Sequence, residues 1–467
     1  MKKQKRGFSL LMSAALTGVL LCGCGGQSGT PTTTQAAQPG TAADGQTQGQ
    51  SQSAPADSSE QVTITFWDHS ASEIHTQIFT HLIEEFEKEN HDIKVNFVPI
   101  PASDAKAKYD VAIQSGTAPD CGGVSQYWMS DFIVQNALVA LDDYMADWDN
   151  AQYLLDMYQQ SIRDMASDGK TYALAHRVTL PTVWLNNQML ADAGKELPSD
   201  WLEVCELAQE LTDTSKGLYG FSIRGGAGSS QQFEQMMYMH SGEEMMFDEN
   251  GNSTVNDPAH VELLAAFADL YMKATPESDL TNGYAEMVAA FDSGTAAMIF
   301  HNLGSYGEHK KTLGEGNFTA ITTLESKKET QAIISNGATC NAVFKDSKNP
   351  EAAFRFVAYL NEHYACSYFS SQIGQIPCNQ EALQDDWVIE VAHMKKAADA
   401  ILSGNCTLIT VPINVIGYYD LHNNELVQGF QQVLLKEISA QQYLDDWAES
   451  MTGLKKDYDA YLASMGQ

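Results

Sequence analysis

The sequence predicts an α/β fold divided into two lobes, and three observations lead to this prediction. A strand pattern, a helix pattern and a second strand pattern follow one another over residues 62–97. The same kind of alternation continues further along the chain, at 183–185, 197–212 and 219–221. The stretch 61–467 is also longer than one hydrophobic core usually organises, so two lobes are expected.

Residues 1–23 predict a lipoprotein export signal. Basic residues up to Arg6 precede an apolar run from Phe8 to Leu21, which is too short to span a bilayer as a stable helix. The run ends at Leu21-Cys22-Gly23-Cys24, which resembles a lipobox, where cleavage precedes a lipidated cysteine. We expect Cys24 to be the mature N-terminus and to carry diacylglycerol and palmitate. An ordinary cleaved secretory signal is the alternative.

Residues 24–60 predict a flexible, low-complexity tether. They are mostly Gly, Ser, Thr, Gln, Ala and Pro, so they bury too little apolar surface to offset the entropy of ordering. No later stretch reaches the roughly 18 uninterrupted apolar residues that a membrane span needs. We therefore expect a folded part at the extracellular face of the cell membrane, held by the lipid on Cys24.

The charge of the chain is strongly negative. Its formal net charge is −33 at pH 7. Such a field repels phosphate backbones, which argues against nucleic-acid binding and favours solubility outside the cell.

Six cysteines of the mature chain are scattered without zinc-type spacing or a C-x-x-C pair. They are Cys121, Cys205, Cys340, Cys366, Cys378 and Cys406. Disulfides and buried free thiols both stay open, and we interpret these cysteines as structural, with no metal site.

The first β-α-β pattern indicates a parallel sheet and a ligand position. Val62, Ile64 and Phe66 alternate with polar residues, and a helix pattern capped at 70–73 separates them from the strand pattern 93–97. In open sheets of this kind, ligands bind beyond the carboxyl ends of the strands. This places Asp68 and His69 near a binding site.

Two further helix starts are predicted. The glycine-rich turn 224–229 leads into a helix whose cap is expected to be Ser229 or Ser230. Asn349-Pro350 is typical of a helix start, and Gly374 of a helix stop.

Short motifs in a fixed order carry a family resemblance. They are Thr65-Phe66-Trp67, Ser115-Gly116-Thr117-Ala118-Pro119-Asp120, Leu141-Asp142-Asp143, Trp184-Leu185-Asn186-Asn187, Pro198-Ser199-Asp200-Trp201, Ala289-Ala290-Phe291-Asp292-Ser293-Gly294, Asn349-Pro350-Glu351 and Gly374-Gln375-Ile376-Pro377. Their order resembles that of the extracellular solute-binding proteins of ABC-type sugar importers, family 1, the group that includes the maltose-binding protein.

The resemblance implies a two-lobe, periplasmic-binding-protein-like fold of type II. Each lobe would be a mixed, mainly parallel sheet flanked by helices, with the ligand cleft at the hinge. The implied segments are 61–178 and 302–375 for lobe 1, and 179–301 and 376–467, with the C-terminal helices, for lobe 2.

The resemblance also implies a function. The protein would capture a sugar or oligosaccharide, neutral or anionic, and deliver it to the permease subunits of an ABC transporter. It would act as a monomer without cofactor or metal. A sensor or adhesin role and a carbohydrate-active enzyme are the alternatives. G-x-S-x-G, H-E-x-x-H, P-loop and dinucleotide motifs are absent from the sequence, which disfavours the enzyme.

A sugar-binding site needs planar aromatic side chains for the C–H face of the ring and polar side chains for its hydroxyls. The candidates are Trp67, Asp68, His69, Tyr127, Trp128, His176, Arg177, Arg224, Asn302, Tyr306, Asn336, Tyr418 and Tyr419. Trp128 ranks above Tyr127, and Trp201 is interpreted as a helix-packing residue. Adjacent residues on one helix point in different directions, so only one of Tyr418 and Tyr419 is expected to face the cleft.

The arginines suggest an anionic ligand. The mature chain has four, and both Arg177 and Arg224 fall where the lobes should meet. A guanidinium beside a helix N-terminus suits a carboxylate or phosphate, which favours an acidic sugar or a sugar phosphate. The alternative is that the arginines neutralise nearby carboxylates or bind neutral hydroxyls.

Overall fold

The computed structural model describes residues 61–328, 331–334, 338–404, 406–409, 411–412, 415 and 417–465. They all lie within one structural unit, 59–467. The predicted signal, the predicted tether with Cys24, and the candidate Asn336 lie outside the described residues.

A six-stranded sheet forms the core of the first lobe. Its strands, in spatial order, are β11 (Ile376–Pro377), β4 (Leu174–Val178), β10 (Thr339–Val343), β3 (Cys121–Ser125), β1 (Val62–Asp68) and β2 (Ile93–Pro99). β1 pairs in parallel with both β2 and β3, which confirms the predicted β-α-β unit. Phe66 is fully buried and packs 5.0 Å from Phe79 of the intervening helix.

A four-stranded sheet forms the core of the second lobe. Its strands, in spatial order, are β6 (Tyr219–Ser222), β7 (Ala296–Asn302), β5 (Pro181–Asn186) and β8 (Phe318–Ile321). A separate parallel pair joins β9 (Gln331–Ile334) to β12 (Cys406–Ile409).

Both sheets are mixed, as predicted, but the expectation that they are mainly parallel is wrong. Among the described strands of the two sheets, parallel pairing is confined to β1–β2, β1–β3 and β6–β7. β10, β11, β5 and β8 run antiparallel to their neighbours. The reason is that the chain passes between the sheets several times and re-enters each in the opposite direction.

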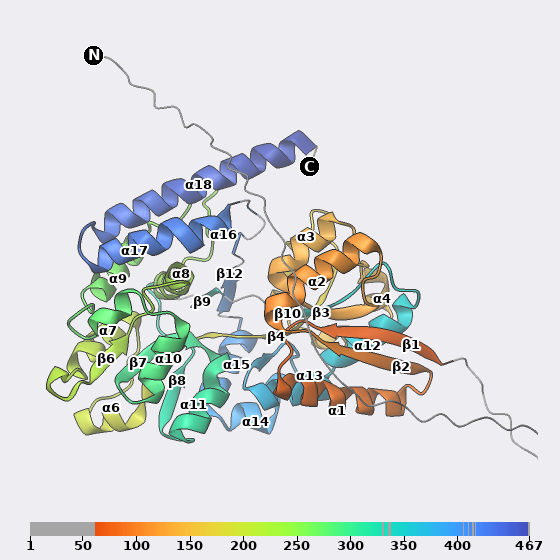
Figure 1. Ribbon diagram of the computed structural model, residues 1–467, viewed down its shortest axis with the longest axis horizontal. Coiled ribbons are helices and arrows are strands. Elements are labelled where there is room, and N and C mark those ends of the chain that lie inside the picture. The colour runs from red at the N-terminus through yellow and green to blue at the C-terminus, as the bar shows by residue number, and fades with distance from the viewer. Residues whose placement is uncertain are drawn as a thin grey trace, which may run out of the picture. The chain divides into compact units, whose positions relative to one another are not determined.

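Helices flank both sheets (Figure 1). Those of the first part of the chain are α1 (Glu73–Glu89), α2 (Ala102–Ser115), α3 (Met129–Val134), α4 (Asp142–Ala146) and α5 (Asp156–Arg163). The middle part contains α6 (Asn187–Ala193), α7 (Trp201–Glu210), α8 (Ser229–Ser241), α9 (Pro258–Ala268), α10 (Tyr284–Asp292) and α11 (Tyr306–Leu313). The last part contains α12 (Pro350–Asn361), α13 (His363–Ile373), α14 (Asp386–Ile389), α15 (Ala392–Leu402), α16 (Tyr418–Asp420), α17 (Leu426–Leu434) and α18 (Ala440–Met465).

The chain crosses directly from one sheet to the other between β4 and β5, through Thr179 and Leu180. The segment 302–375, expected in lobe 1 alone, supplies β8 to the four-stranded sheet and β10 to the six-stranded one, because β8 hydrogen-bonds to β5 and β10 to β3. β11 lies just beyond that segment, yet it pairs with β4. The exact lobe boundaries stay a prediction.

Local signals placed most helix ends correctly, with two corrections. α8 begins after Gly228, whose φ is 83°, so neither Ser229 nor Ser230 is the cap, and Ser230 Oγ instead donates to the carbonyl of His422. The helix expected from Asn349 to Gly374 is divided at Glu362 into α12 and α13, because the backbone of Glu362 is extended.

The six scattered cysteines, Cys121, Cys205, Cys340, Cys366, Cys378 and Cys406, are buried free thiols in this structure. Trp201 is fully buried at the start of α7, 5.0 Å from Phe300, which confirms its interpretation as a packing residue.

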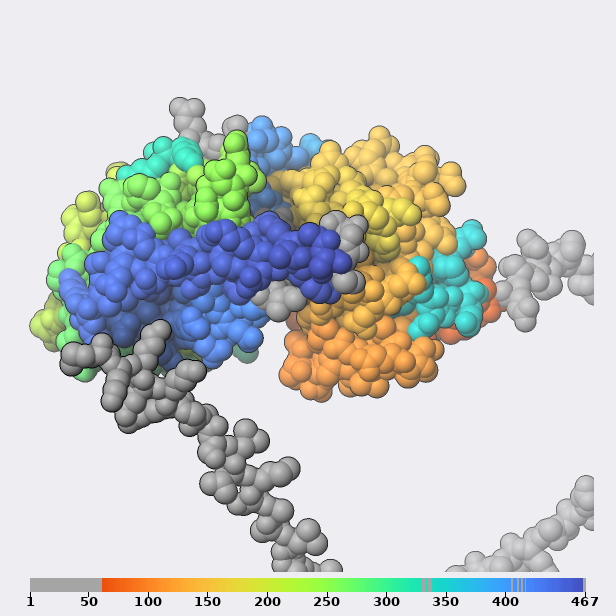
Figure 2. All heavy atoms as spheres, turned by 90° about the horizontal axis from the view of Figure 1, so that it is seen from above, coloured from red at the N-terminus to blue at the C-terminus, as the bar shows by residue number. Residues whose placement is uncertain are grey.

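α18 runs along one face of the molecule, seen as dark blue atoms in Figure 2, and packs on α9 and α17. Within the described part of the chain, no helix combines the length and the apolar character needed to cross a membrane.

Candidate ligand-binding site

A cavity of about 250 Å³ lies where the end of β3 meets α8 and α16. Its lining residues are Tyr127, Gln231, Glu234, Gln235, Val411, Tyr418 and Tyr419. Tyr127 belongs to the short 3₁₀ helix Gln126–Trp128 directly after β3, so the cavity lies beyond the carboxyl end of a strand of the six-stranded sheet. This is the position that the open-sheet rule predicts for a ligand.

Glu234 on α8 is the charged group of this cavity, and only 1% of it is exposed. Its Oε2 accepts a hydrogen bond of 2.8 Å from the hydroxyl of Tyr418. His422 Nε2 lies 3.4 Å from Oε1, and His422 Nδ1 lies 3.1 Å from Ser230 Oγ. His422 belongs to a π-helical turn, Leu421–Glu425, a local geometry that is frequent at functional sites.

Three tyrosine rings form the apolar part of the cavity. The rings of Tyr127 and Tyr419 lie 6.0 Å apart, edge to face, and those of Tyr418 and Tyr419 are also edge to face at 6.0 Å. Burial raises the pKa of Tyr419 to about 12 and raises that of Tyr127 and Tyr418 as well, so all three hydroxyls are protonated at neutral pH. Planar faces with fixed hydroxyl groups are suited to a sugar ring.

Both members of the Tyr418–Tyr419 pair line this cavity, and which of them contacts a ligand stays a prediction. α16 is only three residues long, and the chain bends there from the glycine Gly417 into the π-helical turn. Tyr418 is 3% exposed and reaches Glu234, whereas Tyr419 is 42% exposed and reaches Tyr127. Tyr418 thus packs in the core and lines the cavity at the same time.

Asp68 and His69 lie at the carboxyl end of β1, as predicted, and both are buried. Asp68 Oδ1 accepts a hydrogen bond of 3.2 Å from the backbone N–H of Ser70. The His69 ring stands edge-on to Trp128 at 5.4 Å, and burial lowers the pKa of His69 to about 4, which keeps its imidazole neutral. Trp67 packs against Tyr109 at 5.1 Å.

His176 and Arg177, both on β4, contact Phe369 of α13. The Arg177 guanidinium lies 4.2 Å over the ring of Phe369, and burial lowers the pKa of Arg177 to about 10 while the charge of Asp68 opposes that shift. His176 is fully buried, 5.1 Å from Phe369, and burial lowers its pKa well below the usual value. Neither residue lines the cavity.

Arg224 lies at the carboxyl end of the four-stranded sheet. Its Nε donates a hydrogen bond of 2.6 Å to the carbonyl of Ala227, and its guanidinium lies against Gly228, where a side chain would clash with it. Burial, together with the charge of Arg224, lowers the pKa of the neighbouring His301 to about 3. Arg224 does not line the cavity.

Asn302 and Tyr306 have structural contacts at the end of β7. Asn302 Oδ1 accepts a hydrogen bond of 3.0 Å from the N–H of Gly304 and so caps the following turn. The Tyr306 ring packs at 5.7 Å from Phe318 and at 5.5 Å from His393. Of the candidates in the described residues, the cavity therefore brings together Tyr127, Tyr418 and Tyr419.

Sequence reasoning missed the residues that α8 contributes: Gln231, Glu234 and Gln235. Their signal is present in the stretch Phe233-Glu234-Gln235-Met236-Met237, where a carboxylate and an amide stand among apolar residues of one helix. A charged residue in such a stretch lies either on a narrow exposed face of the helix or in the interior, where glutamate is rare unless it has a partner. The structure shows that Glu234 is buried.

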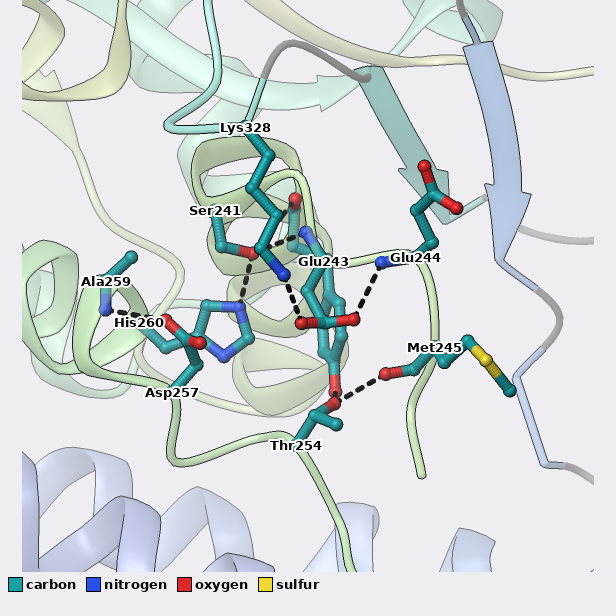
Figure 3. Close-up of polar contacts among 10 residues, drawn as sticks. Ser241, Glu243, Glu244, Met245, Thr254, Asp257, Ala259, His260 and Lys328 are labelled. Atoms are coloured by element: carbon teal, nitrogen blue, oxygen red, sulfur yellow. Dashed lines mark hydrogen bonds and ion pairs between the residues drawn. The ribbon is translucent and has the colours of Figure 1, made fainter. Parts of the chain in front are cut away.

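A second polar cluster lies at the other end of α8 (Figure 3). It holds a hairpin, residues 245–254, in which Phe247 and Ser253 form an antiparallel bridge. Ser241 Oγ lies 2.7 Å from His260 Nε2 and accepts a hydrogen bond from the N–H of Glu243, which in turn pairs with Lys328. Thr254 donates to the carbonyl of Met245, which joins the two arms of the hairpin. Since these polar groups satisfy one another, the cluster reads as structural.

Comparisons with known proteins indicate the family and the fold. Residues 72–363 match the model of a family described as bacterial extracellular solute-binding protein. An ABC transporter periplasmic-binding protein of Escherichia coli is 23% identical over 319 residues, covering 64% of this chain and 69% of that protein.

Solved structures share the fold. An ABC substrate-binding protein of Listeria monocytogenes, solved in complex with cycloalternan, superposes with a TM-score of 0.67 at 22% identity, covering 84% of this chain and 99% of that one. The sugar-binding protein MalE of Xanthomonas citri gives a TM-score of 0.70 at 17% identity, covering 86% and 99%. The two-lobe α/β architecture is therefore confirmed.

Proposed function

The chain belongs to the bacterial extracellular solute-binding protein family, and we propose that it captures a carbohydrate and delivers it to the permease of an ABC-type importer. It acts by binding, without covalent chemistry. The observation that carries this proposal is the cavity at the end of β3, which is lined by three tyrosines, a buried carboxylate and two glutamine side chains.

The cavity offers what a sugar needs. The tyrosine rings can stack on the C–H face of a sugar ring, while Glu234 and the amides of Gln231 and Gln235 can hydrogen-bond its hydroxyls. The volume of about 250 Å³ lies just below the range of about 300–1,000 Å³ for small-molecule sites, so it suits one sugar unit rather than a long chain.

The mechanism that follows is capture between lobes. Tyr127 follows a strand of the six-stranded sheet, whereas Glu234 and Tyr419 lie on helices that pack with the four-stranded sheet. A ligand held by both groups ties the lobes together, and the permease selects that liganded form. Thr179 and Leu180, which connect β4 to β5, are the expected hinge.

An anionic sugar is the second candidate ligand. It rests on Arg224, whose guanidinium bonds to a backbone carbonyl and pairs with no carboxylate among the described residues, although Arg224 lies outside the cavity that Tyr127 and Glu234 line. Arg177 supports it less, since its charge faces that of Asp68. Replacing Arg177 and Arg224 by alanine tests whether the ligand is anionic. If the affinity for the bound sugar is unchanged in both variants, the proposal of an anionic ligand is wrong.

Thermal melts of the chain starting at Gly25 test the proposed function. The panel contains neutral mono- and oligosaccharides, uronic acids, sugar phosphates and amino sugars, and each sample is checked for cleavage products. A ligand at one hundred times its dissociation constant adds about 2.7 kcal/mol of stability, so binding is visible. A rise in melting temperature with intact sugar supports capture. Cleavage indicates an enzyme, and no rise with any sugar contradicts the proposal.

Anchoring by lipid is part of the same proposal. The lipobox-like sequence ending at Cys24 and the low-complexity segment behind it support a lipoprotein at the extracellular face of the membrane. Palmitate labelling of cells that produce the chain tests it, with Cys24→Ala as the variant. Label on the wild-type protein and none on the variant is the expected result, whereas a secreted, unlabelled wild-type protein contradicts the anchor.

A further inference from the structure

Glu234 is a buried carboxylate whose charge has little compensation. Among the described residues that line the cavity, none is Lys or Arg. His422 is the nearest basic group, 3.4 Å from Oε1, and it carries charge only when protonated. Burial of a charge is unfavourable unless a partner or hydrogen bonds offset it, so this arrangement favours a ligand that supplies them.

The two oxygens of Glu234 are treated differently. Oε2 accepts the hydrogen bond from Tyr418, whereas Oε1 has no hydrogen-bond partner among the described residues. Asp279, in contrast, accepts hydrogen bonds from the N–H of Ile223 and from Asn282. Asp68 Oδ2 also lacks a hydrogen-bond partner among the described residues, but Asp68 faces the charge of Arg177. Among the described residues that line the cavity, Glu234 is the one carboxylate, and the basic neighbour of its Oε1 is His422.

The remaining walls favour a cation. Tyr127, Tyr418 and Tyr419 line the cavity together with the carboxylate, and the face of a tyrosine ring attracts an ammonium group. A neutral sugar could give Glu234 a hydroxyl donor, but it would leave the negative charge uncompensated. An ammonium group supplies the hydrogen bond, the opposite charge and the contact with the rings together.

We propose that the preferred ligand is a carbohydrate bearing a protonated amino group, and that Glu234 is the residue that selects it. The inference rests on the proposed carbohydrate-binding function and names the class of sugar. In the bound state the ammonium donates to Glu234 Oε1, while Gln231 lines the same cavity beside the hydroxyls of the ring.

Calorimetric titrations with matched sugar pairs test the inference. The pairs are glucosamine with glucose, galactosamine with galactose, and the β-1,4-linked glucosamine dimer with cellobiose, each with its N-acetyl form. Measurements are made near pH 6, where amines of pKa about 8 are protonated. The expected result is at least one amino sugar bound about tenfold more tightly than its hydroxyl and N-acetyl counterparts, which corresponds to about 1.4 kcal/mol.

Two variants separate the role of Glu234 from the general negative charge of the chain. Glu234→Gln keeps the shape and an acceptor for the Tyr418 hydroxyl, and it is expected to abolish the preference for the amine. Glu244→Gln is the matched control, because Glu244 is exposed and its carboxylate points away from the cluster in Figure 3. The control is expected to keep the preference, also in 0.5 M salt, where a screening length of about 3–10 Å weakens long-range attraction.

The results of these titrations separate the inference from the proposed function. Equal or weaker binding of the amine in every pair overturns the inference and leaves the proposed function standing if neutral or acidic sugars bind. A preference for amines that survives Glu234→Gln also overturns it. Failure of every sugar to bind the wild-type chain overturns the proposed function together with the inference.

Discussion

The hydroxyl of Tyr418 donates a 2.8 Å hydrogen bond to Glu234 Oε2 across 184 positions of the chain. The contact joins α16 to α8 and orients the one carboxylate that lines the candidate cavity. Both residues are almost fully buried, so this contact belongs to the core as well as to the site.

Tyr418→Phe removes the donor and leaves the buried carboxylate with less support. We expect the free energy of unfolding to fall by about 1.5–3 kcal/mol, the usual range for a hydrogen bond to a charged group. Urea unfolding followed by circular dichroism measures the change. Tyr461→Phe, at an exposed position on α18, is the control and should stay within about 0.5 kcal/mol of wild type. A wild-type value for Tyr418→Phe contradicts the role given to this bond.

Tyr419→Ala separates binding from stability. Tyr419 is 42% exposed, and its ring contacts Tyr127 and Tyr418 at the cavity wall. We expect stability to change by less than about 1 kcal/mol, while affinity for the bound sugar falls about tenfold or more because a stacking face is lost. Titration calorimetry and thermal melts on the same preparation check both. An unchanged affinity excludes Tyr419 from the site.

Trp201→Ala has the opposite profile. The indole is fully buried against Phe300, away from the cavity residues. Truncation leaves a large void, so the free energy of unfolding is expected to fall by about 3–5 kcal/mol. Under conditions where the variant is folded, its affinity for sugar should match that of wild type. A large loss of affinity in the folded variant would place Trp201 in the site.

Asp279 adds a pH dependence to stability. Burial raises the pKa of Asp279 to about 6 in the folded chain, above the unperturbed value of 3.8. The folded chain therefore binds this proton more tightly than the unfolded chain, and stability falls as pH rises from about 4 to about 6.

Asp279→Asn should remove this part of the pH dependence. Its amide oxygen can still accept from the N–H of Ile223. Between about pH 4 and about pH 6, the free energy of unfolding of the wild type is expected to fall relative to that of the variant by up to about 3 kcal/mol. Urea melts at several pH values measure the difference, and a difference that does not vary with pH contradicts the raised pKa.

Thiol labelling tests the state of the cysteines. Burial raises the pKa of Cys205, Cys366 and Cys406 to about 12, so native thiols are neutral as well as shielded. The chain starting at Gly25 should show no reaction with Ellman's reagent when folded and should react at all six cysteines in denaturant. Fewer than six reactive thiols in denaturant without reductant would reveal a disulfide.

Much of the local structure followed from the sequence. The alternation at Val62, Ile64 and Phe66 and the helix after Ser72 are set by neighbouring residues, because side-chain period and capping act over one or two turns. The strand directions of β10 and β8 did not follow, because they depend on where the chain crosses between sheets.

The site was predicted in part for the same reason. Tyr127, Tyr418 and Tyr419 were recognisable as aromatic residues at loop positions, and the order of motifs indicated the family. Glu234 was not, since nothing within a few residues of it shows that a tyrosine 184 positions away will bury and orient it. By itself the sequence predicted an export-type leader and determined the helix and strand patterns and the class of protein, which local chemistry and motif order carry. Only the tertiary structure decided which side chains share a cavity and which carboxylate is buried in its wall, because burial and proximity arise when distant segments pack together.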